Sequence, residues 1–432
     1  MRHEKKPKIT GAGRTQTGLV IIVLVIFLLA VPVTAGTRPV VDLIGTPASG
    51  PADLKVQFKG LSTGIPTGWA WYFGDETYRS PWTPVNKSLG TPANKTFFTL
   101  VATPDSKIVL MGGCNHSAGG NACFINNETW VSADYGKTWS LRNASPGWSA
   151  RYKHSTMALP DGSIVLLGGF DGNRLLNDVW VSKDNGRFWT RTSANANWSP
   201  RDSPGSVVLP DGSIVLTGGN YNTPVNNLND SWRSTDKGKT WTRLNSNCNW
   251  TSRFGHTMVV LSDGGIVLMG GYRYPEGYLN DTWYSKDAGK TWWLMNESSG
   301  WAARNYPVGI AMPDNSIILT GGNAAGGPSY NDTWRSVDLG KTWTLVNISS
   351  GYPTDNLWYR GIGMPDSSIF VVADGYWYDS PNQIWRFDPA GSYIQNPVHI
   401  YHVPGKYQVA LQVSIKDDNF NSTRKQGYIK VT

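Results

Sequence analysis

Aromatic side chains gather beside amide, carboxyl and arginine groups in a few segments of this sequence. The richest segments read YRYPEGY, residues 272–278, and DGYWYD, residues 374–379. Aromatic rings cover the apolar face of a sugar, while amides and carboxylates match hydroxyl and peptide groups. Binding of a glycan or a polar peptide is therefore predicted, with the alternative that these rings only pack within their own loops. The candidate ligand-binding residues are Tyr272, Tyr274, Tyr278, Tyr376, Trp377 and Tyr378.

Four arginines are a second set of residues that could do chemistry, because an arginine cluster can hold a carboxylate. Each of them follows a tryptophan by three residues, and they are Arg151, Arg201, Arg253 and Arg304. Residues that recur at one equivalent position of a repeat are better explained by packing, since a catalytic group is expected in one unit and not in all of them. Paired catalytic carboxylates cannot be picked out by spacing, and no nucleophile elbow, phosphate loop or HExxH motif occurs. No catalytic residue, metal ion or cofactor is therefore predicted, and a non-catalytic protein is favoured.

These residues belong to a repeat of about 51 residues. The stretch SWRSTDKGKTW, Ser231 to Trp241, has four near-copies, and its closing tryptophan recurs at intervals of 50 to 52 residues. Each unit also contains a Pro-Asp-Gly type of turn, an apolar run that ends in Gly-Gly, and an N-D-x-W segment. Short β-branched runs between such turns predict four strands in every unit. Residues predicted to be structural in the repeat are Asp134, Asp184, Asp236, Asp287, Asp338, Trp139, Trp189, Trp241, Trp292 and Trp343.

The motifs resemble two known kinds of repeat. The double glycine, the N-D-x-W segment and R-x-x-H (residues 151–154 and 253–256) resemble kelch repeats, and S-x-D-x-G-x-T-W resembles the Asp-box of sialidase-type propellers. The resemblance implies an all-β fold with a β-propeller, in which a unit of four strands forms one blade. Six turns predict six blades over residues 77–390, with Ser80–Asn86 completing a degenerate sixth unit. The aspartates that mark the turns are Asp105, Asp161, Asp211, Asp263, Asp314 and Asp366.

A second domain is expected from segments at the two ends of the chain. The string W-x-W-x-F-G-D, Trp69 to Asp75, resembles the central strand of a PKD-type immunoglobulin-like domain. Its continuation occurs only at Asn396–Val413, where residues alternate as in a half-buried strand. Residues 37–76 and 391–432 are therefore predicted to form one discontinuous β-sandwich, with the propeller of residues 77–390 inserted in a surface hairpin.

The N-terminal segment predicts export. A basic leader precedes the apolar run Leu19–Val31, and small residues follow at Val33 and Ala35. This pattern is typical of a signal peptide over residues 1–35, with an uncleaved membrane anchor as the alternative. Basic residues ahead of the apolar run keep that end in the cytoplasm, so the rest of the chain is expected outside the cell in both cases. Contact with the membrane is expected only through this segment, if it is uncleaved.

The cysteines and sequons fit an exported chain. Cys114 and Cys123 bracket a short loop and are a possible disulfide, while Cys248 is expected to be a packed residue. Three cysteines without clustered histidines make a structural zinc site unexpected. The chain also contains thirteen Asn-x-Ser/Thr sequons, which indicate a glycoprotein, although several of them belong to the repeat itself.

The distribution of charge and the topology of a blade limit the classes of function that are expected. The net charge of +8 is not gathered into a Lys/Arg cluster beyond the leader, so no nucleic-acid partner is expected. In a four-stranded blade, the Pro-Asp-Gly turns and Asp-boxes share one face, and the variable loops share the other. Variable loops on a rigid scaffold are where binding usually occurs. We expect a secreted or cell-surface protein that binds a glycan or protein through the variable-loop face, with two alternatives: a glycan-active hydrolase or lyase of sialidase-like architecture, or a structural envelope component.

Overall fold

The structure is a computed structural model. It describes residues 39–79, 82–86, 95–116, 123–221, 226–324, 329–354, 357–375, 382–415 and 420–432. These ranges contain strands and turns and no helix, so no helix within them is long and apolar enough to cross a membrane. The predicted all-β class is confirmed. The expected leader, residues 1–35, lies outside the described residues.

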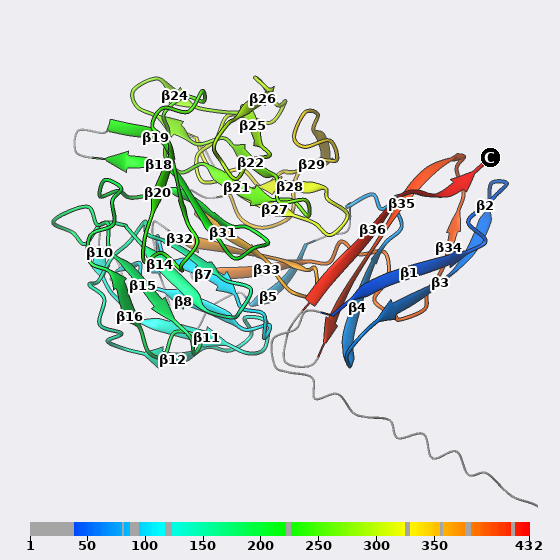
Figure 1. Cartoon of the computed structure of the whole chain (residues 1–432), viewed down its shortest axis with the longest axis horizontal. Helices are drawn as coiled ribbons and strands as arrows, with labels where there is room; N and C mark the ends of the chain where they lie inside the picture. Colours follow the sequence, from blue (N-terminus) through cyan, green and yellow to red (C-terminus); the bar gives the residue numbers. More distant parts are fainter. Residues whose placement is uncertain are drawn as a thin grey trace, which may run out of the picture. The chain divides into compact units, whose positions relative to one another are not determined.

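Six four-stranded antiparallel sheets are formed by the described residues between Thr83 and Phe387 (Figure 1). Within each sheet the strands lie side by side in chain order, apart from the sixth, which ends on an N-terminal strand. The first three sheets contain β7 (Thr99–Ala102), β8 (Ile108–Met111), β11 (Thr129–Ser132) and β12 (Ser140–Asn143); β13 (Ser155–Ala158), β14 (Ile164–Leu167), β15 (Val179–Ser182) and β16 (Thr190–Ser193); and β17 (Gly205–Val208), β18 (Ile214–Tyr221), β19 (Asn226–Ser234) and β20 (Thr242–Asn245). The other three contain β21 (Thr257–Val260), β22 (Ile266–Met269), β25 (Thr282–Ser285) and β26 (Trp293–Asn296); β27 (Val308–Ala311), β28 (Ile317–Thr320), β29 (Thr333–Ser336) and β30 (Thr344–Asn347); and β31 (Leu357–Gly363), β32 (Ile369–Gly375), β33 (Gln383–Phe387) and β5 (Thr83–Asn86).

The sixth sheet joins the two ends of the repeat array. Strand β5 pairs with β33, with Asn86 opposite Ile384 and Pro84 opposite Trp385, and Figure 1 draws β5 in blue beside β33 in orange. The first strands of neighbouring sheets also contact one another all the way round, including β31 with β7. Sheets arranged in such a closed ring form a β-propeller. The predicted propeller fold is confirmed.

The second strand of each sheet lies in the packed core. In β14, β22 and β28 every residue is buried, because apolar side chains on both strand faces meet a neighbouring sheet. Val109 and Met111 of one sheet, for example, share a cluster with Ile164 and Leu166 of the next. A strand covered on both faces is apolar throughout instead of alternating, which explains the IVLL and IVLM runs.

The repeated Asp-box is a hydrogen-bonded turn between the third and fourth strands. Asp236 accepts bonds from the hydroxyl of Ser234 at 2.8 Å and from the amide and hydroxyl of Thr240 at 2.9 and 2.6 Å. Gly238 takes a φ of 83°, and the indole of Trp241 donates to its carbonyl at 3.0 Å. The Trp241 ring then meets Trp198 edge to face at 6.0 Å. The same serine contact and indole bond recur around Asp134, Asp184, Asp287 and Asp338, and around Trp139, Trp189, Trp292 and Trp343.

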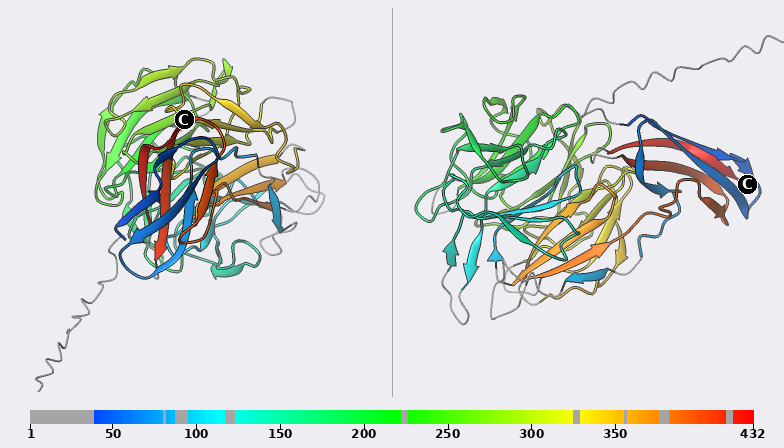
Figure 2. Two further views of the ribbon diagram at one scale, coloured as in Figure 1. Left: turned by 90° about the vertical axis from the view of Figure 1, so that its right-hand side faces the viewer. Right: turned by 90° about the horizontal axis from the view of Figure 1, so that it is seen from below.

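Two further sheets combine strands from both ends of the chain (Figure 2). One contains β1 (Val41–Thr46), β3 (Leu54–Ser62) and β34 (Val398–Tyr401), and the other contains β2 (Ser49–Gly50), β36 (Phe420–Val431), β35 (Gly405–Ile415) and β4 (Pro66–Tyr72). The blue N-terminal strands lie beside the red C-terminal strands in both views of Figure 2. Phe58, Trp71, Phe73, Tyr401 and Leu411 share one buried cluster, and Tyr407 packs against it.

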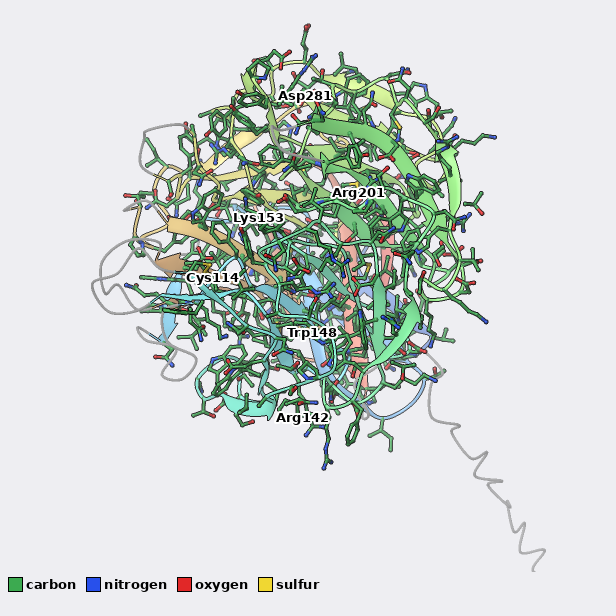
Figure 3. All side chains as sticks on the ribbon, turned by 90° about the vertical axis from the view of Figure 1, so that its left-hand side faces the viewer. Cys114, Arg142, Trp148, Lys153, Arg201 and Asp281 are labelled. Atoms are coloured by element: carbon green, nitrogen blue, oxygen red, sulfur yellow. A yellow bond between two sulfur atoms is a disulfide. The ribbon has the colours of Figure 1, made fainter. Side chains whose placement is uncertain are left out.

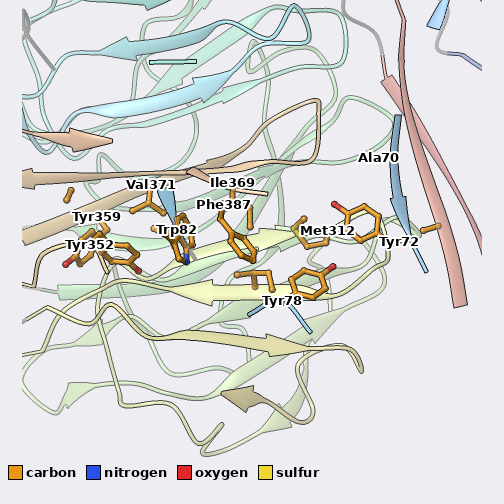
Figure 4. Close-up of a cluster of buried hydrophobic side chains, with 14 residues drawn as sticks. Ala70, Tyr72, Tyr78, Trp82, Met312, Tyr352, Tyr359, Ile369, Val371 and Phe387 are labelled. Atoms are coloured by element: carbon orange, nitrogen blue, oxygen red, sulfur yellow. The ribbon is translucent and has the colours of Figure 1, made fainter. Parts of the chain in front are cut away.

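Strands β4 and β35 of the second of these sheets contact residues beside the Pro-Asp-Gly turns. Tyr72 and Ala410 share a buried cluster with Met312 and Tyr78, of which Figure 4 labels all but Ala410. The Gln408 amide donates to the Asp314 carbonyl at 2.6 Å, which adds a polar contact to the apolar one. A cavity of about 420 Å³ lies between the six turns and residues 420–422 of β36. These contacts involve the Pro-Asp-Gly turns and not the variable loops.

Candidate functional site

A cavity of about 210 Å³ opens at the centre of the variable-loop face, where the first strands of the sheets begin. Six residues stand at one equivalent position around it, seven residues before the proline (or Ser262) of each turn. We call these six the mouth ring, and they are Phe97, Lys153, Ser203, Gly255, Tyr306 and Trp358. All except Trp358 line the cavity. In Figure 3, Lys153 lies near the centre of the view and Arg142 lies at its lower rim.

Backbone hydrogen bonds link the mouth ring from unit to unit. The amide of Lys153 donates to the carbonyl of Phe97 at 3.3 Å, and Ser203 donates to Lys153 at 2.8 Å. Gly255 donates to Ser203 at 3.0 Å, and Tyr306 donates to Gly255 at 2.7 Å. All five residues have a φ between 50° and 62°. The ring is therefore a regular backbone belt that holds its residues in the left-handed conformation.

The side chains on this regular belt differ in every unit. Left-handed backbone costs a residue other than glycine on the order of 1–2 kcal/mol, and only Gly255 avoids that cost. Phe97, Lys153, Ser203 and Tyr306 retain a side chain although glycine would fit the backbone better. Strained residues that cluster at a cavity point to a functional site. The mouth ring thus joins unlike side chains in left-handed backbone to a cavity, whereas the left-handed residues of the Asp-boxes, such as Lys237, do not line it.

Two basic groups line the cavity. The Nζ atom of Lys153 lies 5.3 Å from the centroid of the Phe97 ring, within the range of a cation–π contact. Arg360 donates from Nε to the Phe98 carbonyl at 3.0 Å, and its guanidinium carbon is 5.4 Å from the centroid of Tyr306. Both basic groups are therefore anchored beside the first sheet, one from the second sheet and one from the sixth.

Two carboxyl groups stand behind the ring. Asp374 is fully buried, accepts a bond from the amide of Phe97 at 3.2 Å, and has a pKa that burial raises to about 7. Burial also raises the pKa of Asp202, which is next to Ser203 in the chain. The Oδ1 atom of each has no hydrogen-bond partner among the residues that the structure describes. Neither residue lines the cavity.

Three aromatic rings lie next to one another on one side of the cavity, and two of them, Phe97 and Tyr306, line it. The Trp358 ring lies 5.1 Å from Phe97 and 4.9 Å from Tyr306, measured between centroids. The hydroxyls of Tyr306 and Ser203 are 2.6 Å apart, and burial raises the pKa of Tyr306, so this tyrosine stays neutral. The rim can therefore offer a ring face and a hydroxyl to the same ligand.

Two histidines below the ring are neutral. The Nε2 atom of His154 is 2.9 Å from the Thr99 hydroxyl, and that of His256 is 2.8 Å from the Thr217 hydroxyl. Burial lowers the pKa of His154 well below its ordinary value and lowers that of His256 to about 3. Neither imidazole adds charge to the cavity at physiological pH.

Three of the six predicted aromatic residues can be placed. The rings of Tyr272 and Tyr278 lie 4.8 Å apart, on the short strands β23 (Tyr272–Arg273) and β24 (Gly277–Tyr278). Tyr272 also lies 5.5 Å from Phe254, so both tyrosine rings contact another ring of their own unit. Tyr274 is half exposed, and its amide donates to the Asn227 side chain at 2.8 Å. The other three, Tyr376, Trp377 and Tyr378, lie outside the described residues.

The repeated arginines are buried inside the sheets. Arg201 donates from Nη1 and Nη2 to the two carboxylate oxygens of Asp230 at 2.7 and 2.8 Å, and from Nη1 to the Gly218 carbonyl. The same fork joins Arg151 to Asp178, Arg253 to Asp281 and Arg304 to Asp332, and Lys95 pairs with Glu128 at the equivalent place. Figure 3 labels Arg201 and Asp281 of this set. A buried charge needs such a partner, so these arginines hold the blade together and do not face the cavity.

The cysteines have structural positions. Cys114 of β9 (Cys114–His116) and Cys123 of β10 (Cys123–Ile125) are joined by a disulfide, with their Cα atoms 5.3 Å apart. Strand β9 also pairs with β6 (Lys95–Thr96), which directly precedes Phe97 of the mouth ring. Cys248 is buried, and burial raises its pKa to about 12, so its thiol remains protonated. No group of three or more potential metal ligands occurs in the described part of the chain.

Comparison with known proteins finds one curated kelch-repeat relative and a solved structure of low similarity. No protein-family model matches the chain. An F-box/kelch-repeat protein of Arabidopsis thaliana is 27% identical over 178 residues, which is 37% of this chain and 37% of the relative's length. The match therefore spans little more than a third of the curated relative. The solved structure of YjhT covers 58% of this chain and 84% of its own, with a TM-score of 0.49 and 14% identity.

The mouth ring cannot be predicted from a residue pattern, because its six positions share no residue type. One signal was present, namely the constant distance of seven residues from each turn. This position contains Phe, Lys, Ser, Gly, Tyr and Trp in successive units, so in the sequence it looks like part of a variable connection between units. The tyrosine-rich loops were predicted as the site because of their composition.

Proposed function

We propose that this protein is exported and binds a glycan or protein ligand at the mouth ring, without catalysing a reaction. The mouth ring itself carries the proposal. Four side chains are kept there in left-handed backbone, they differ from unit to unit, and they surround a cavity of about 210 Å³. A concave site with aromatic walls and a few polar groups is the usual form of a ligand site.

The domain organisation that we propose supports this role. The six four-stranded sheets would be the blades of one six-bladed propeller, over residues 77–390. Residues 37–76 and 391–432 would be one PKD-type sandwich that serves as a spacer or attachment element. Its contacts at the Pro-Asp-Gly turns favour a ligand on the opposite, variable-loop face.

A glycan-active enzyme is the second candidate, and one observation favours it. Asp374 has a pKa raised to about 7 by burial, which suits a general acid or base. Against this role, Asp374 does not line the cavity, and its described hydrogen bond goes to the backbone of Phe97. Binding without catalysis therefore remains the better proposal.

A matched pair of lysine variants tests the proposal. Lys153 and Lys237 both have left-handed backbone, with φ of 54° and 59°, but Lys237 belongs to an Asp-box and pairs with Asp161. Glycine fits either backbone, so Lys153→Gly and Lys237→Gly should both fold. Glycan and protein arrays should identify a ligand of the wild type. We expect Lys153→Gly to weaken the affinity for that ligand at least tenfold and Lys237→Gly to leave it unchanged.

Three outcomes would contradict the proposal. If both variants weaken ligand binding equally, the mouth ring is not the binding site. Hydrolysis of chromogenic glycosides, abolished by Asp374→Asn, would favour the enzyme. A protein that is exported but binds nothing on either array would favour a structural envelope component.

A further inference from the structure

We infer that Asn197 and Asn249 are the residues at which this protein carries N-linked glycans. Both begin Asn-x-Ser/Thr sequons, Asn-Trp-Ser at residues 197–199 and Asn-Trp-Thr at residues 249–251. Among the sequon asparagines that the structure describes, these two are exposed and the others are partly buried. The inference needs the proposed export, but it does not depend on ligand binding at the mouth ring.

The two asparagines occupy one equivalent position of the repeat, directly before the buried aromatic residue that links two sheets. In the first, fourth and fifth units this position is Gly147, Gly300 and Gly351. Apart from its chain neighbours, a Cβ atom at any of these glycines would meet no heavy atom closer than 3.7 Å. The position therefore faces open space, and a large group attached there displaces nothing.

The backbone beside each asparagine is fixed, so the asparagine side chain stays at the surface. The side-chain amide of Asn177 donates to the carbonyls of Ala196 and Trp198 at 3.0 and 3.2 Å. Trp198 is 1% exposed and packs edge to face against Trp241. The next unit repeats the asparagine clamp and the tryptophan pair. Each sequon thus pairs an anchored tryptophan with an asparagine that points to solvent.

An N-linked glycan needs an amide hydrogen that the fold does not use. In the transfer, the amide nitrogen bonds to the anomeric carbon of a glycosyl diphosphate carried on a membrane lipid. The bond from that carbon to oxygen breaks, the lipid diphosphate leaves, and one amide proton passes to a base of the transferase. Neither Asn197 nor Asn249 donates a side-chain hydrogen bond to a residue within the described ranges. Both amides can therefore give up a hydrogen without loss to the fold.

The sequons of the N-D-x-W segments are the contrasting case. The amide nitrogen of Asn229 donates to Oδ1 of Asn247 at 2.6 Å and to the Cys248 carbonyl at 3.0 Å. The amides of Asn280 and Asn331 also donate to two acceptors each. A side-chain amide has only two hydrogens, so a glycan would remove one of these bonds and leave an acceptor unpaired. These three sequons maintain the repeat and should stay unmodified.

Mass spectrometry of the full chain secreted from cultured animal cells tests the inference. Treatment with a peptide N-glycosidase converts each glycan-bearing asparagine to aspartate, which changes the peptide mass. We expect conversion at Asn197 and Asn249 and none at Asn229, Asn280 or Asn331. Asn197→Gln and Asn249→Gln should each remove one glycan and keep the melting temperature within a few degrees of the wild type. Asn229→Gln should leave the glycan mass unchanged and lower the melting temperature.

The first unit offers a matched test in the opposite direction. Gly147 precedes Trp148 and Ser149, so Gly147→Asn completes a sequon identical to residues 197–199. We expect this variant to gain one glycan. Gly147→Gln places a side chain on the same backbone without completing a sequon, and it should gain none.

Three results would overturn the inference: no conversion at either proposed residue, equal conversion of Asn229 and Asn197 in the folded protein, or a folded Gly147→Asn variant without the extra glycan. Failure of export is a separate result. If the chain's own leader does not deliver it, an unrelated secretion signal can replace residues 1–35. Glycans at Asn197 and Asn249 would then support the inference although the proposed export fails.

Discussion

Phe97, Lys153, Ser203 and Tyr306 keep a side chain where the backbone favours glycine. The same belt accepts Gly255 in the fourth unit, so the belt does not require these side chains for its hydrogen bonds. At the residue scale, the mouth ring is therefore distinguished by unlike side chains that line one cavity, since the Asp-boxes also hold non-glycine residues in left-handed backbone. The buried arginines show the opposite case, because a repeated charge with a repeated partner maintains the fold.

A pH prediction follows from Asp374. Burial raises its folded-state pKa to about 7, above the ordinary value of 3.8, so the folded protein holds the proton more tightly than the unfolded chain. Its contribution to stability is complete below about pH 4 and is lost as the pH rises through 7, by up to about 1.4 kcal/mol per pH unit. Urea unfolding between pH 4.5 and 7.5 should show this slope, and Asp374→Asn should reduce it. A slope that is unchanged in Asp374→Asn would contradict the buried, protonated state. Part of the slope should persist, since burial also raises the pKa of Glu76 to about 7.

Each propeller sheet is an element that cannot bury its faces alone. Its second strand is covered by neighbouring sheets, and its Asp-box tryptophan meets the tryptophan that precedes a buried arginine. Repeats that bury surface only against neighbours depend on a continuous array. This dependence explains why the Asp-box is nearly invariant among five units while the loops on the other face are free to vary.

Tryptophan substitutions test this view of the element. Trp241 is 5% exposed, donates to the Gly238 carbonyl and packs on Trp198. Trp241→Ala should destabilise the protein by roughly 3–5 kcal/mol, as buried tryptophan truncations do. Trp293 is 42% exposed, so Trp293→Ala should change stability by less than about 1 kcal/mol. Denaturant unfolding measures both, and a ligand titration should find the folded fraction of Trp241→Ala fully active. Equal destabilisation by the two variants would contradict the packing role.

At the scale of the whole molecule, strands from both ends of the chain share two sheets, and the six sheets of the propeller come from the residues between them. The N-terminal segment before the propeller and the C-terminal segment after it lie close together. The Gly391 amide donates a hydrogen bond to the Trp71 carbonyl at 2.8 Å. The sandwich has its own buried cluster, which includes Phe58, Trp71 and Leu411. A domain interrupted at such a place keeps its core when the insert is removed.

Removal of the propeller tests that independence. We expect residues 37–76 joined to residues 391–432 by a short Gly/Ser linker to fold as a β protein. Circular dichroism should show β structure, and the amide NMR spectrum should be dispersed. Tyr72 and Ala410 would lose their contacts with Met312, so some loss of stability is expected. A disordered product would mean that the sandwich depends on the propeller.

The sequence by itself determined the repeat, its strands and its turns. Each depends on residues close together in the chain: Pro-Asp-Gly turns, paired glycines, β-branched runs and the Asp-box. A period of about 51 residues with four strands was enough to predict the β-propeller. It also predicted that the arginines pack, since their slot repeats, and the contacts with Asp178, Asp230, Asp281 and Asp332 agree.

Only the tertiary structure decided which residues meet at the centre. Ring closure through β5 and β33 brings five of the six mouth-ring positions, from Phe97 to Tyr306, around one cavity, although about 50 residues separate each from the next. Their residue types share nothing, so no local pattern marks them. The predicted Tyr272 and Tyr278 contact each other within one loop, whose ends pair as β23 and β24. Local chemistry specifies strands and turns, whereas the composition of a site that gathers one residue from each unit depends on the closure of the whole ring.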